Sequence, residues 1–376
     1  MVKLKTFWKI VLILLLLLLM STTFVACSIF VYLNSIEFKY IINQDANAVT
    51  ITGIDTDDKG FIIPDTIDGY PVTAIADYAF KNNENLIMIK VPDTILYIGE
   101  GAFDNCKNLV FIYGLENCTG LSAIENETFK DCNNLHTIKL PDNITSIGDR
   151  AFEFCHNLRE LSIPNSVSYI GEKAFSNCQN IKEIKIPSGV TKIEKETFLG
   201  CASMKSVTLP DGITHIGWGA FDACMKLESI EIPYSVNTIE EAAFLRCYSL
   251  LNIKVAPENS VYASIDGVLY TKDLTKLVAY PAGKTEKTFS VPQGVTEIFK
   301  AFTYNQNLEI INLPNSIISI SNMFLYETSI KIINYEGSIS DWKKIASMST
   351  LDCGEFFEGI NCADGQIAKD GTVTYN

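Results

Sequence analysis

Phenylalanine and cysteine recur along this chain at one fixed spacing. From residue 129 to residue 244 every 23rd residue is a phenylalanine, and a cysteine follows each one three positions later. The six phenylalanines are Phe129, Phe152, Phe175, Phe198, Phe221 and Phe244. A period of 20 to 50 residues is typical of stacked supersecondary units, because a unit of that size cannot bury its own apolar face. We therefore expect a repeat protein whose function depends on a surface built by many units.

Proline keeps the same register as the phenylalanines, and it shows where each unit turns. Prolines recur every 23 residues at Pro141, Pro164, Pro187, Pro210 and Pro233. The residues before each proline alternate between apolar and polar, as in Leu-Ser-Ile-Pro, which predicts a short strand. Proline cannot donate to a strand ladder and would end it. Since the repeats contain no long apolar stripe of helical period, the pattern favours a β-rich solenoid.

The unit resembles the leucine-rich repeat of BspA-type surface proteins. It has their Leu-x-x-Ile-x-Ile-Pro strand, their Ile-Gly turn and their Ala-Phe-x-x-Cys ending, and the resemblance extends from near Phe61 to Gly337. It implies a β-rich right-handed solenoid with about 23 residues per coil, and we count about eleven coils. It also implies attachment to host matrix proteins, host cells or other microbes.

Three segments depart from the repeat and predict the domain boundaries. Residues 1–33 are a signal or membrane-anchor segment, and residues 34–337 are the solenoid. Within the solenoid, an island at about 256–290 has two β-rich runs around a turn, with Asp266-Gly267 as a second turn signal, which predicts a hairpin. Residues 338–376 resemble the C-terminal cap of such proteins, with a helix start at Ser340 to Trp342 and a turn at Cys362 to Gly365.

The N-terminal segment has three lysines followed by an uncharged run from Ile10 to Leu33. As a helix, this run would extend about 36 Å, enough to cross the roughly 30 Å core of a bilayer. Two alternatives take only Ile10 to Met20 as the apolar part of a signal peptide, with cleavage after Ser28 or with lipidation of Cys27. All three place the repeats outside the cytoplasm.

The charge of the chain argues against nucleic acid as a partner. The formal net charge is −14, and residues 34–376 hold 27 basic against 44 acidic residues, a net −17. A surface of that sign repels phosphate backbones. Membrane contact is expected only through the N-terminal segment, and we expect no cofactor.

Seven of the eleven cysteines share one repeat position, and we expect them to be structural. They are Cys106, Cys132, Cys155, Cys178, Cys201, Cys224 and Cys247. Stacked coils carry equivalent side chains in parallel about 4.8 Å apart, whereas a disulfide needs β-carbons about 3.8 Å apart, and a spacing of 23 residues does not supply the converging ligands of a metal site. We predict a ladder of buried thiols that donate weakly to loop carbonyls. Cys353 and Cys362 remain as a possible disulfide of the cap.

An enzyme is disfavoured because no catalytic group of residues can be found. The three histidines, His136, His156 and His215, occupy three different repeat positions. A catalytic base must come within hydrogen-bond reach of a nucleophile, and these positions separate them. We therefore assign no catalytic, cofactor or metal residue.

The candidate binding face is the outward side of the strands. Because side chains alternate along a strand, the residues between the apolar ones face away from the core and form columns across the coils. One column is Lys90, Lys139, Ser162, Lys185, Thr208, Glu231 and Lys254, and an irregular unit adds Phe111 and Tyr113. The sequence thus predicts a surface protein that binds an extracellular protein, with adhesion as the expected role. A scaffold module of a surface assembly is the alternative.

Overall fold

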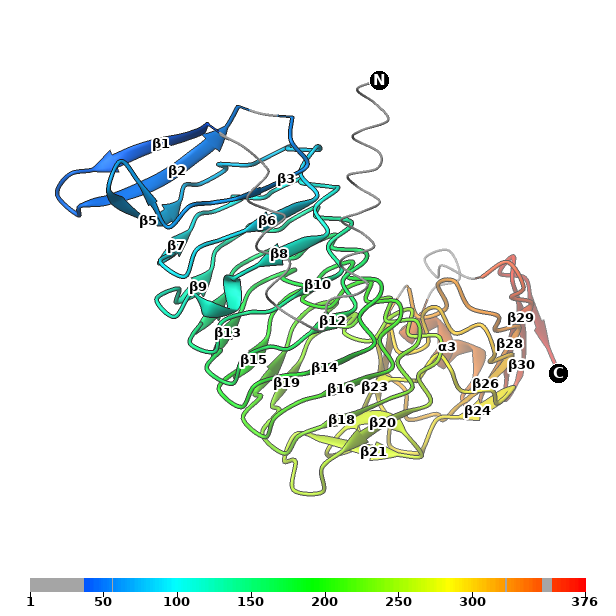
Figure 1. Cartoon of the computed structure of the whole chain (residues 1–376). Coiled ribbons are helices and arrows are strands. Elements are labelled where there is room, and N and C mark those ends of the chain that lie inside the picture. The colour runs from blue at the N-terminus through cyan, green and yellow to red at the C-terminus, as the bar shows by residue number, and fades with distance from the viewer. Residues whose placement is uncertain (1–36, 56, 322, 347–353) are drawn as a thin grey trace.

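The computed structural model describes residues 37–376 except residues 56, 322 and 347–353 (Figure 1). The three interpretations of the N-terminal segment, including lipidation of Cys27, lie outside the described residues, and so does Cys353. Among the residues that are described, the structure contains no helix with the length and apolar character of a membrane span. Cys362 is half-buried and carries a free thiol.

The described chain forms a β-solenoid of about thirteen turns with a spacing of about 23 residues. The expected fold class is confirmed, but the count of about eleven coils was too low. Part of the difference lies at the N-terminus, where β2 (Ala48–Ile54) pairs in parallel with β5 (Tyr70–Ile75) and places Val49 opposite Val72. This coil lacks the phenylalanine and cysteine of the motif, so the sequence pattern does not reveal it.

Each regular coil contributes two short strands, one to each of two rows of parallel strands, and hydrogen bonding divides these rows into several small sheets. The first strand of each coil lies just before the position of the motif proline, which is Leu115 after β8 and Ala256 after β20. These strands are β6 (Met88–Lys90), β8 (Phe111–Tyr113), β10 (Thr137–Ile138), β12 (Glu160–Leu161), β14 (Glu183–Lys185), β16 (Ser206–Thr208), β18 (Ser229–Ile232) and β20 (Asn252–Val255). The second strand returns the chain, and these strands are β7 (Tyr97–Ile98), β9 (Ala123–Ile124), β11 (Ser146–Ile147), β13 (Tyr169–Ile170), β15 (Lys192–Ile193), β17 (His215–Ile216) and β19 (Thr238–Ile239). Registers such as Ile184 opposite Val207 and Ile193 opposite Ile216 repeat the 23-residue step.

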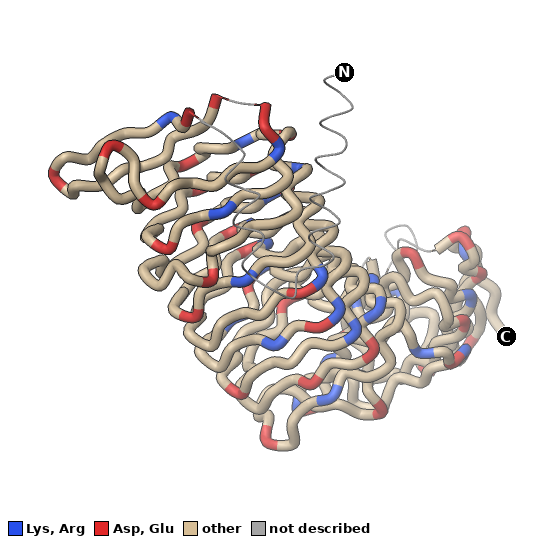
Figure 2. The backbone as a smooth tube through the Cα atoms, in the orientation of Figure 1, with Lys and Arg blue, Asp and Glu red and all other residues tan. Residues whose placement is uncertain are grey.

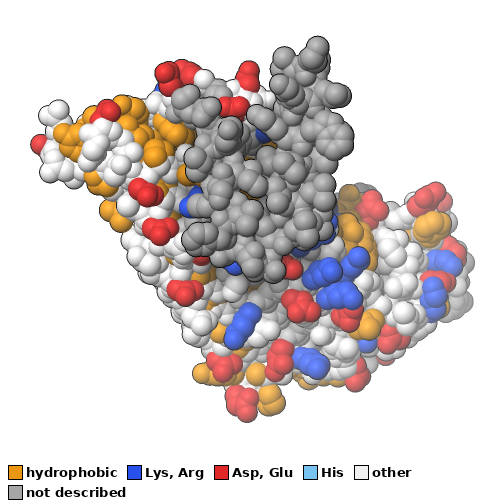
Figure 3. Space-filling model, in the orientation of Figure 1, with side chains coloured by type: hydrophobic (Ala, Val, Ile, Leu, Met, Phe, Trp, Pro, Cys, Tyr) orange, Lys and Arg blue, Asp and Glu red, His pale blue; other side chains and the backbone are white. Residues whose placement is uncertain are grey.

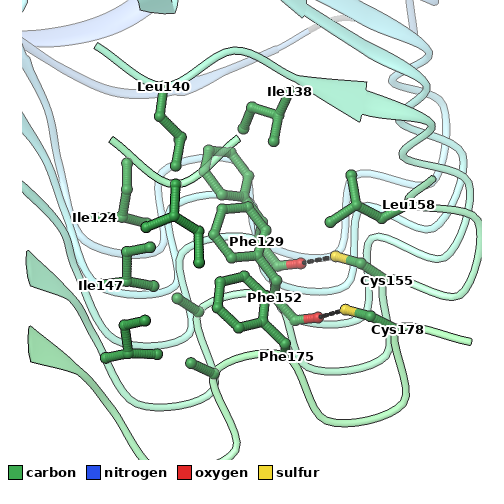
Figure 4. Packing of buried hydrophobic residues seen from close by; sticks show 14 of the residues in the cluster. Ile124, Phe129, Ile138, Leu140, Ile147, Phe152, Cys155, Leu158, Phe175 and Cys178 are labelled. Atoms are coloured by element: carbon green, nitrogen blue, oxygen red, sulfur yellow. Dashed lines mark hydrogen bonds between the residues drawn. The ribbon is translucent and has the colours of Figure 1, made fainter. Parts of the chain in front are cut away.

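The phenylalanines form one continuous stack through the core (Figure 4). From Phe80 to Phe244 successive rings lie 5.2–6.0 Å apart and within 20° of parallel. Phe175 and Phe198 are fully buried and stack at 5.7 Å, as predicted. The rings are farther apart than the roughly 4.8 Å between paired strands. The array therefore fans out on the phenylalanine side, and its coils follow a curved path (Figure 1).

The cysteine ladder is confirmed, and its hydrogen bonds have one repeated geometry. Each of the seven thiols is free and buried. Each lies 3.1–3.3 Å from the carbonyl oxygen of the phenylalanine in the preceding coil, to which it donates (Figure 4). Burial raises the pKa of Cys106 and of Cys201 to about 12. The thiols are therefore protonated donors at neutral pH and fill space within the core.

The turns after the return strands use left-handed backbone in almost every coil. Two positions per coil have positive φ, including Tyr78, Arg150, Lys173 and Phe154 at 55–61°. Such a conformation costs about 1 kcal/mol or more for a residue other than glycine. It directs each backbone N–H toward the next coil, as in the bond from Tyr78 N to Glu100 O at 2.8 Å. These bonds between coils offset the cost.

The island forms an antiparallel meander that joins the solenoid. The expected hairpin around residues 271–275 is formed by β22 (Val268–Thr271) and β23 (Lys276–Ala279). At the second turn signal, Asp266-Gly267, both residues have positive φ and β21 (Tyr262–Ile265) pairs with β22. β23 pairs in parallel with β25 (Glu297–Ile298). The later strands are β24 (Thr288–Ser290), β26 (Ile310–Leu313), β27 (Ser319–Ile320) and β28 (Ile332–Tyr335).

Caps cover both ends of the array. At the N-terminal end, β1 (Phe38–Asn43) forms an antiparallel hairpin with β2. β3 (Gly60–Ile62) then pairs in parallel with β6 and begins the row of first strands, and β4 (Thr66–Ile67) pairs antiparallel with β5. At the other end, α3 (Ile339–Ile345) begins with a capping box between Ser338 and Asp341 and buries Trp342. Three strands complete this cap, namely β29 (Gly359–Cys362), β30 (Gly365–Ala368) and β31 (Val373–Tyr375).

The stack predicts a large cost for removing one ring. We expect Phe175→Ala to lower the free energy of unfolding by about 3 to 5 kcal/mol, because the two neighbouring rings cannot close the cavity. Urea denaturation gives the value. Tyr234→Ala is the matched control, since this ring is 53% exposed and should cost less than about 0.5 kcal/mol. A loss under about 1 kcal/mol for Phe175→Ala would remove the ring from the core.

The buried thiols should resist alkylation in the native protein. The thiolate is the reactive form, and burial raises the pKa of the ladder thiols. Mass spectrometry after treatment with iodoacetamide should show Cys155, Cys178, Cys201 and Cys224 unmodified until the chain is denatured. The half-buried Cys362, whose pKa is raised to about 11, should react before them. Rapid labelling of the ladder in native protein contradicts the structure.

The same thiols predict a loss of stability at alkaline pH. Because the folded state raises their pKa, it keeps protons that the unfolded chain releases above its ordinary thiol pKa of about 8.5. Their contribution is complete below that pH and is lost as the pH rises. Cys178→Ala should reduce the decline in unfolding free energy between pH 9 and 10 by up to about 1.4 kcal/mol per pH unit. An unchanged slope in urea titrations would show that Cys178 ionises in the folded state.

Candidate functional site

The first strands of the coils form one side of the solenoid, and we call their outward side chains over residues 87–254 the strand face. In the motif Leu-x-x-Ile-x-Ile, the strand face consists of the second, third and fifth positions of each coil. The fifth-position column is Lys90, Tyr113, Lys139, Ser162, Lys185, Thr208, Glu231 and Lys254. The strand registers place Lys90 opposite Tyr113, Lys185 opposite Thr208 and Glu231 opposite Lys254. The sheet thus aligns the predicted residues into one column.

The predicted column is exposed, and the structure adds Tyr113 to it. All seven predicted members of the column are exposed, whereas Phe111 and Tyr113 are half-buried. The sequence interpretation placed both aromatic residues beside the lysine row. Tyr113 instead fills the place between Lys90 and Lys139, and Phe111 lies in the neighbouring column, opposite Thr137.

The aromatic residues form a small cluster on the strand face. The rings of Phe111 and Tyr113 stack at 5.9 Å, and Phe111 lies 6.4 Å from the ring of His136. Burial raises the pKa of Tyr113. The three extra residues of this unit follow the strand, where Gly114 (φ 85°) leads into a short 3-10 helix, Leu115–Asn117. The insertion therefore leaves the strand and its outward rings in register.

Charge is distributed unevenly between the strand face and the rest of the protein. The strand face carries seven basic residues, Lys90, Lys139, Arg159, Lys182, Lys185, Lys205 and Lys254. It carries four acidic residues, Glu160, Glu183, Glu228 and Glu231. Its net charge is +3, against −20 for the other 20 basic and 40 acidic residues of 34–376. Figure 2 shows acidic residues along the edge formed by β7, β13, β15 and β19. Figure 3 shows lysine and arginine side chains on the face turned to the viewer, with acidic side chains among them.

The histidines lie apart, in three different environments. His136 Nδ1 lies 2.6 Å from the carbonyl oxygen of Asn134, and His156 Nδ1 lies 3.2 Å from the side chain of Asn133. His215 Nε2 lies 3.0 Å from Glu240 on the return side. Over the part of the chain that the structure describes, no three His, Cys, Asp or Glu side chains form a group able to hold a metal ion.

A cavity of about 90 Å³ lies where the regular repeat meets the island. Phe244, Val278, Tyr280 and Phe299 line it, and Glu241 and Lys300 form a 3.1 Å ion pair there. Phe244 is half-buried, unlike the earlier rings of the stack, because the island interrupts the next coil. Sequence reasoning did not predict this cavity, although the break of register after Cys247 is its signal.

This fold defines a class, the leucine-rich repeat proteins. Within it, the chain belongs to the BspA-type family. The family model for the BspA type leucine rich repeat region matches six copies, over residues 73–201, 168–281 and 282–351. Proteins of this solenoid family are typically non-enzymatic and occur at the cell surface.

Solved structures of bacterial leucine-rich repeat proteins share the fold. A leucine-rich cell surface protein from Faecalibacterium prausnitzii is 24% identical with a TM-score of 0.56, over 85% of this chain and 99% of that one. A leucine-rich repeat protein from Bacteroides ovatus is 25% identical with a TM-score of 0.56, over 87% of this chain and 76% of that one. No curated protein matches the chain.

Proposed function

We propose that this chain is an exported cell-surface protein that binds other proteins through its strand face and so attaches cells to host proteins or to neighbouring cells. The observation that carries the proposal is the column from Lys90 to Lys254, which is exposed except at the half-buried Tyr113, with the ring of Phe111 in the column beside it. The stacked parallel strands hold these side chains at a fixed spacing before any partner binds. Solenoids use such faces for protein recognition.

The aromatic cluster has the properties of an interface hot spot. Phe111 and Tyr113 are half-buried in the free protein, so their rings are held in place and lose little conformational freedom on binding. Tyrosine is enriched at the energetic centres of interfaces. The aliphatic stems of Lys90 and Lys139 on either side of Tyr113 can cover apolar partner surface while their ammonium groups bind polar groups.

Surface location is part of the proposal and has two supports. The related F. prausnitzii protein is described as a cell surface protein. In this chain, the N-terminal run from Ile10 to Leu33 has the composition of an anchor or an export signal. The anchor, the cleaved signal and lipidation at Cys27 all leave the solenoid outside the cytoplasm. Binding by the strand face is the same in each case.

A triple variant tests the strand face. The full chain, purified in a nonionic detergent, is measured by surface plasmon resonance against purified soluble extracellular proteins. For a protein that binds, we expect Tyr113→Ala with Lys139→Ala and Lys185→Ala to weaken binding at least about tenfold, or about 1.4 kcal/mol. The melting curve should stay nearly unchanged, because these side chains contribute little to the core.

The matched control is Tyr169→Ala with Lys192→Ala and Lys343→Ala, three exposed residues away from the strand face. This control should bind normally. Undiminished binding by the strand-face variant would instead place the site at the island, between Ile265 and Tyr280, or on the acidic outer side.

A further inference from the structure

Among the residues that the structure describes, the basic residues of the strand face have no ion-pair partners. In the described part of the chain, 13 of the 20 lysines and arginines outside the strand face make ion pairs, for example Arg246 with Asp222 at 2.6 Å. None of the seven on the strand face does so among these residues. These cations can bind a carboxylate without breaking an existing ion pair.

The coils after the island provide a comparison within the protein, because the second position of their motif is also charged. There, Lys287, Glu309 and Lys331 occupy the second position of three successive coils, so the signs alternate. Glu309 lies 2.9 Å from Lys287 and 2.7 Å from Lys331. These two ammonium groups, chiefly through hydrogen bonds, lower the pKa of Glu309 to about 2. The C-terminal coils thus neutralise this column internally.

Before the island, the same position carries three cations in succession, and Glu228 follows them in the next coil. The cations are Arg159, Lys182 and Lys205. Lys205 N donates to Lys182 O at 2.7 Å, so these two residues are direct neighbours across the ladder. Like charges directly opposite each other on a sheet are destabilising. The free protein tolerates this repulsion, and an anionic partner would relieve it.

From this contrast we infer that the partner of the strand face presents an acidic protein segment, which binds over β10 to β16. This inference rests on the proposed function and names the chemistry of the partner. The cations that receive the segment are Lys139, Arg159, Lys182, Lys185 and Lys205. The remainder of the protein has a net charge of −20 and repels the same segment elsewhere. Charge complementarity therefore fixes where the partner binds.

The arrangement favours a protein segment over a sulfated polysaccharide. Glu160 and Glu183 are exposed in the third-position column, between the two columns of cations. A polymer with dense, regular negative charge would meet both carboxylates. A protein segment can place its own carboxylates over the lysines and uncharged residues over Glu160 and Glu183. It can also bring apolar side chains to Phe111 and Tyr113, which a sulfated sugar chain lacks.

Calorimetry with defined probes tests the inference. The full chain is titrated with a synthetic peptide in which glutamates are spaced among alanine, serine and leucine, and with the same peptide carrying glutamine at each glutamate position. We expect the glutamate peptide to bind and the glutamine peptide to show no binding. Affinity should fall severalfold between about 50 and 300 mM salt, because salt screens exposed charges.

Two charge-reversal variants locate the binding. Lys182→Glu with Lys205→Glu should weaken binding of the glutamate peptide at least about tenfold, or about 1.4 kcal/mol. Lys192→Glu with Lys343→Glu makes the same change in net charge away from the strand face and should bind within about twofold, since Lys192 lies on the return strand β15 and Lys343 on the C-terminal helix α3. The neutral variant Lys182→Gln with Lys205→Gln should also weaken binding while keeping the melting temperature, which separates loss of the site from loss of folding.

Each opposite result overturns the inference. The inference fails when the glutamate peptide does not bind, when both reversal variants lose affinity equally, or when heparin oligosaccharide binds and the peptide does not. The proposed function is tested separately. If a protein partner requires Tyr113 but still binds at high salt and still binds the Lys182→Glu with Lys205→Glu variant, the strand face remains the binding site. The inference of an acidic partner segment is then wrong.

Discussion

One buried carbonyl joins each coil to the next. The carbonyl oxygen of Phe129 accepts a hydrogen bond from Cys132 N at 3.2 Å, which closes the turn of its own coil. It also accepts from the thiol of Cys155 in the following coil at 3.1 Å. A buried carbonyl needs such partners, and a thiol is small enough to donate beside a stacked ring without opening a void. Cysteine at this position therefore satisfies packing and hydrogen bonding together, and the strands on either side follow the spacing that this contact sets.

The period of phenylalanine and cysteine was enough to predict the solenoid, the buried ring of Phe175 and the thiol donors, because these depend on contacts repeated in every coil. The left-handed turns could not be predicted. Tyr78, Arg150 and Phe154 adopt φ values usual for glycine, and only bonds to the next coil make this conformation acceptable. The extra N-terminal coil was missed since β2 lacks the motif. The exposure of the predicted column followed from strand alternation, whereas the position of Tyr113 depended on where the three-residue insertion lies.

The 23-residue step also shapes the surface. Equivalent residues of successive coils become neighbours, so the choice of one residue type at one position creates a column of that type. Columns of apolar residues form the core, and a column of asparagines forms a ladder in which Asn157 Nδ2 donates to Asn134 Oδ1 at 3.0 Å. Lysine and arginine at equivalent positions of successive coils form the charged columns of the strand face. Because the core is formed by other positions of the coil, the strand face can change its chemistry without changing the fold.

The outward columns of the first strands differ between the coils before the island and the coils after it. After it, the outward column of the first strands is satisfied within the protein: Asn312 donates to Ser290, Asn334 to Asn312, and Asn361 to Asn334, each at 2.8 Å. Before it, the corresponding column holds Lys139 and Lys185, which have no such partners among the described residues. The core divides at the same place, with the stack ending at a half-buried Phe244 and a second apolar cluster beginning at Val268. A column whose groups bond to one another gives stability to the C-terminal coils, and a column whose groups are left unpaired gives the N-terminal coils the capacity to bind.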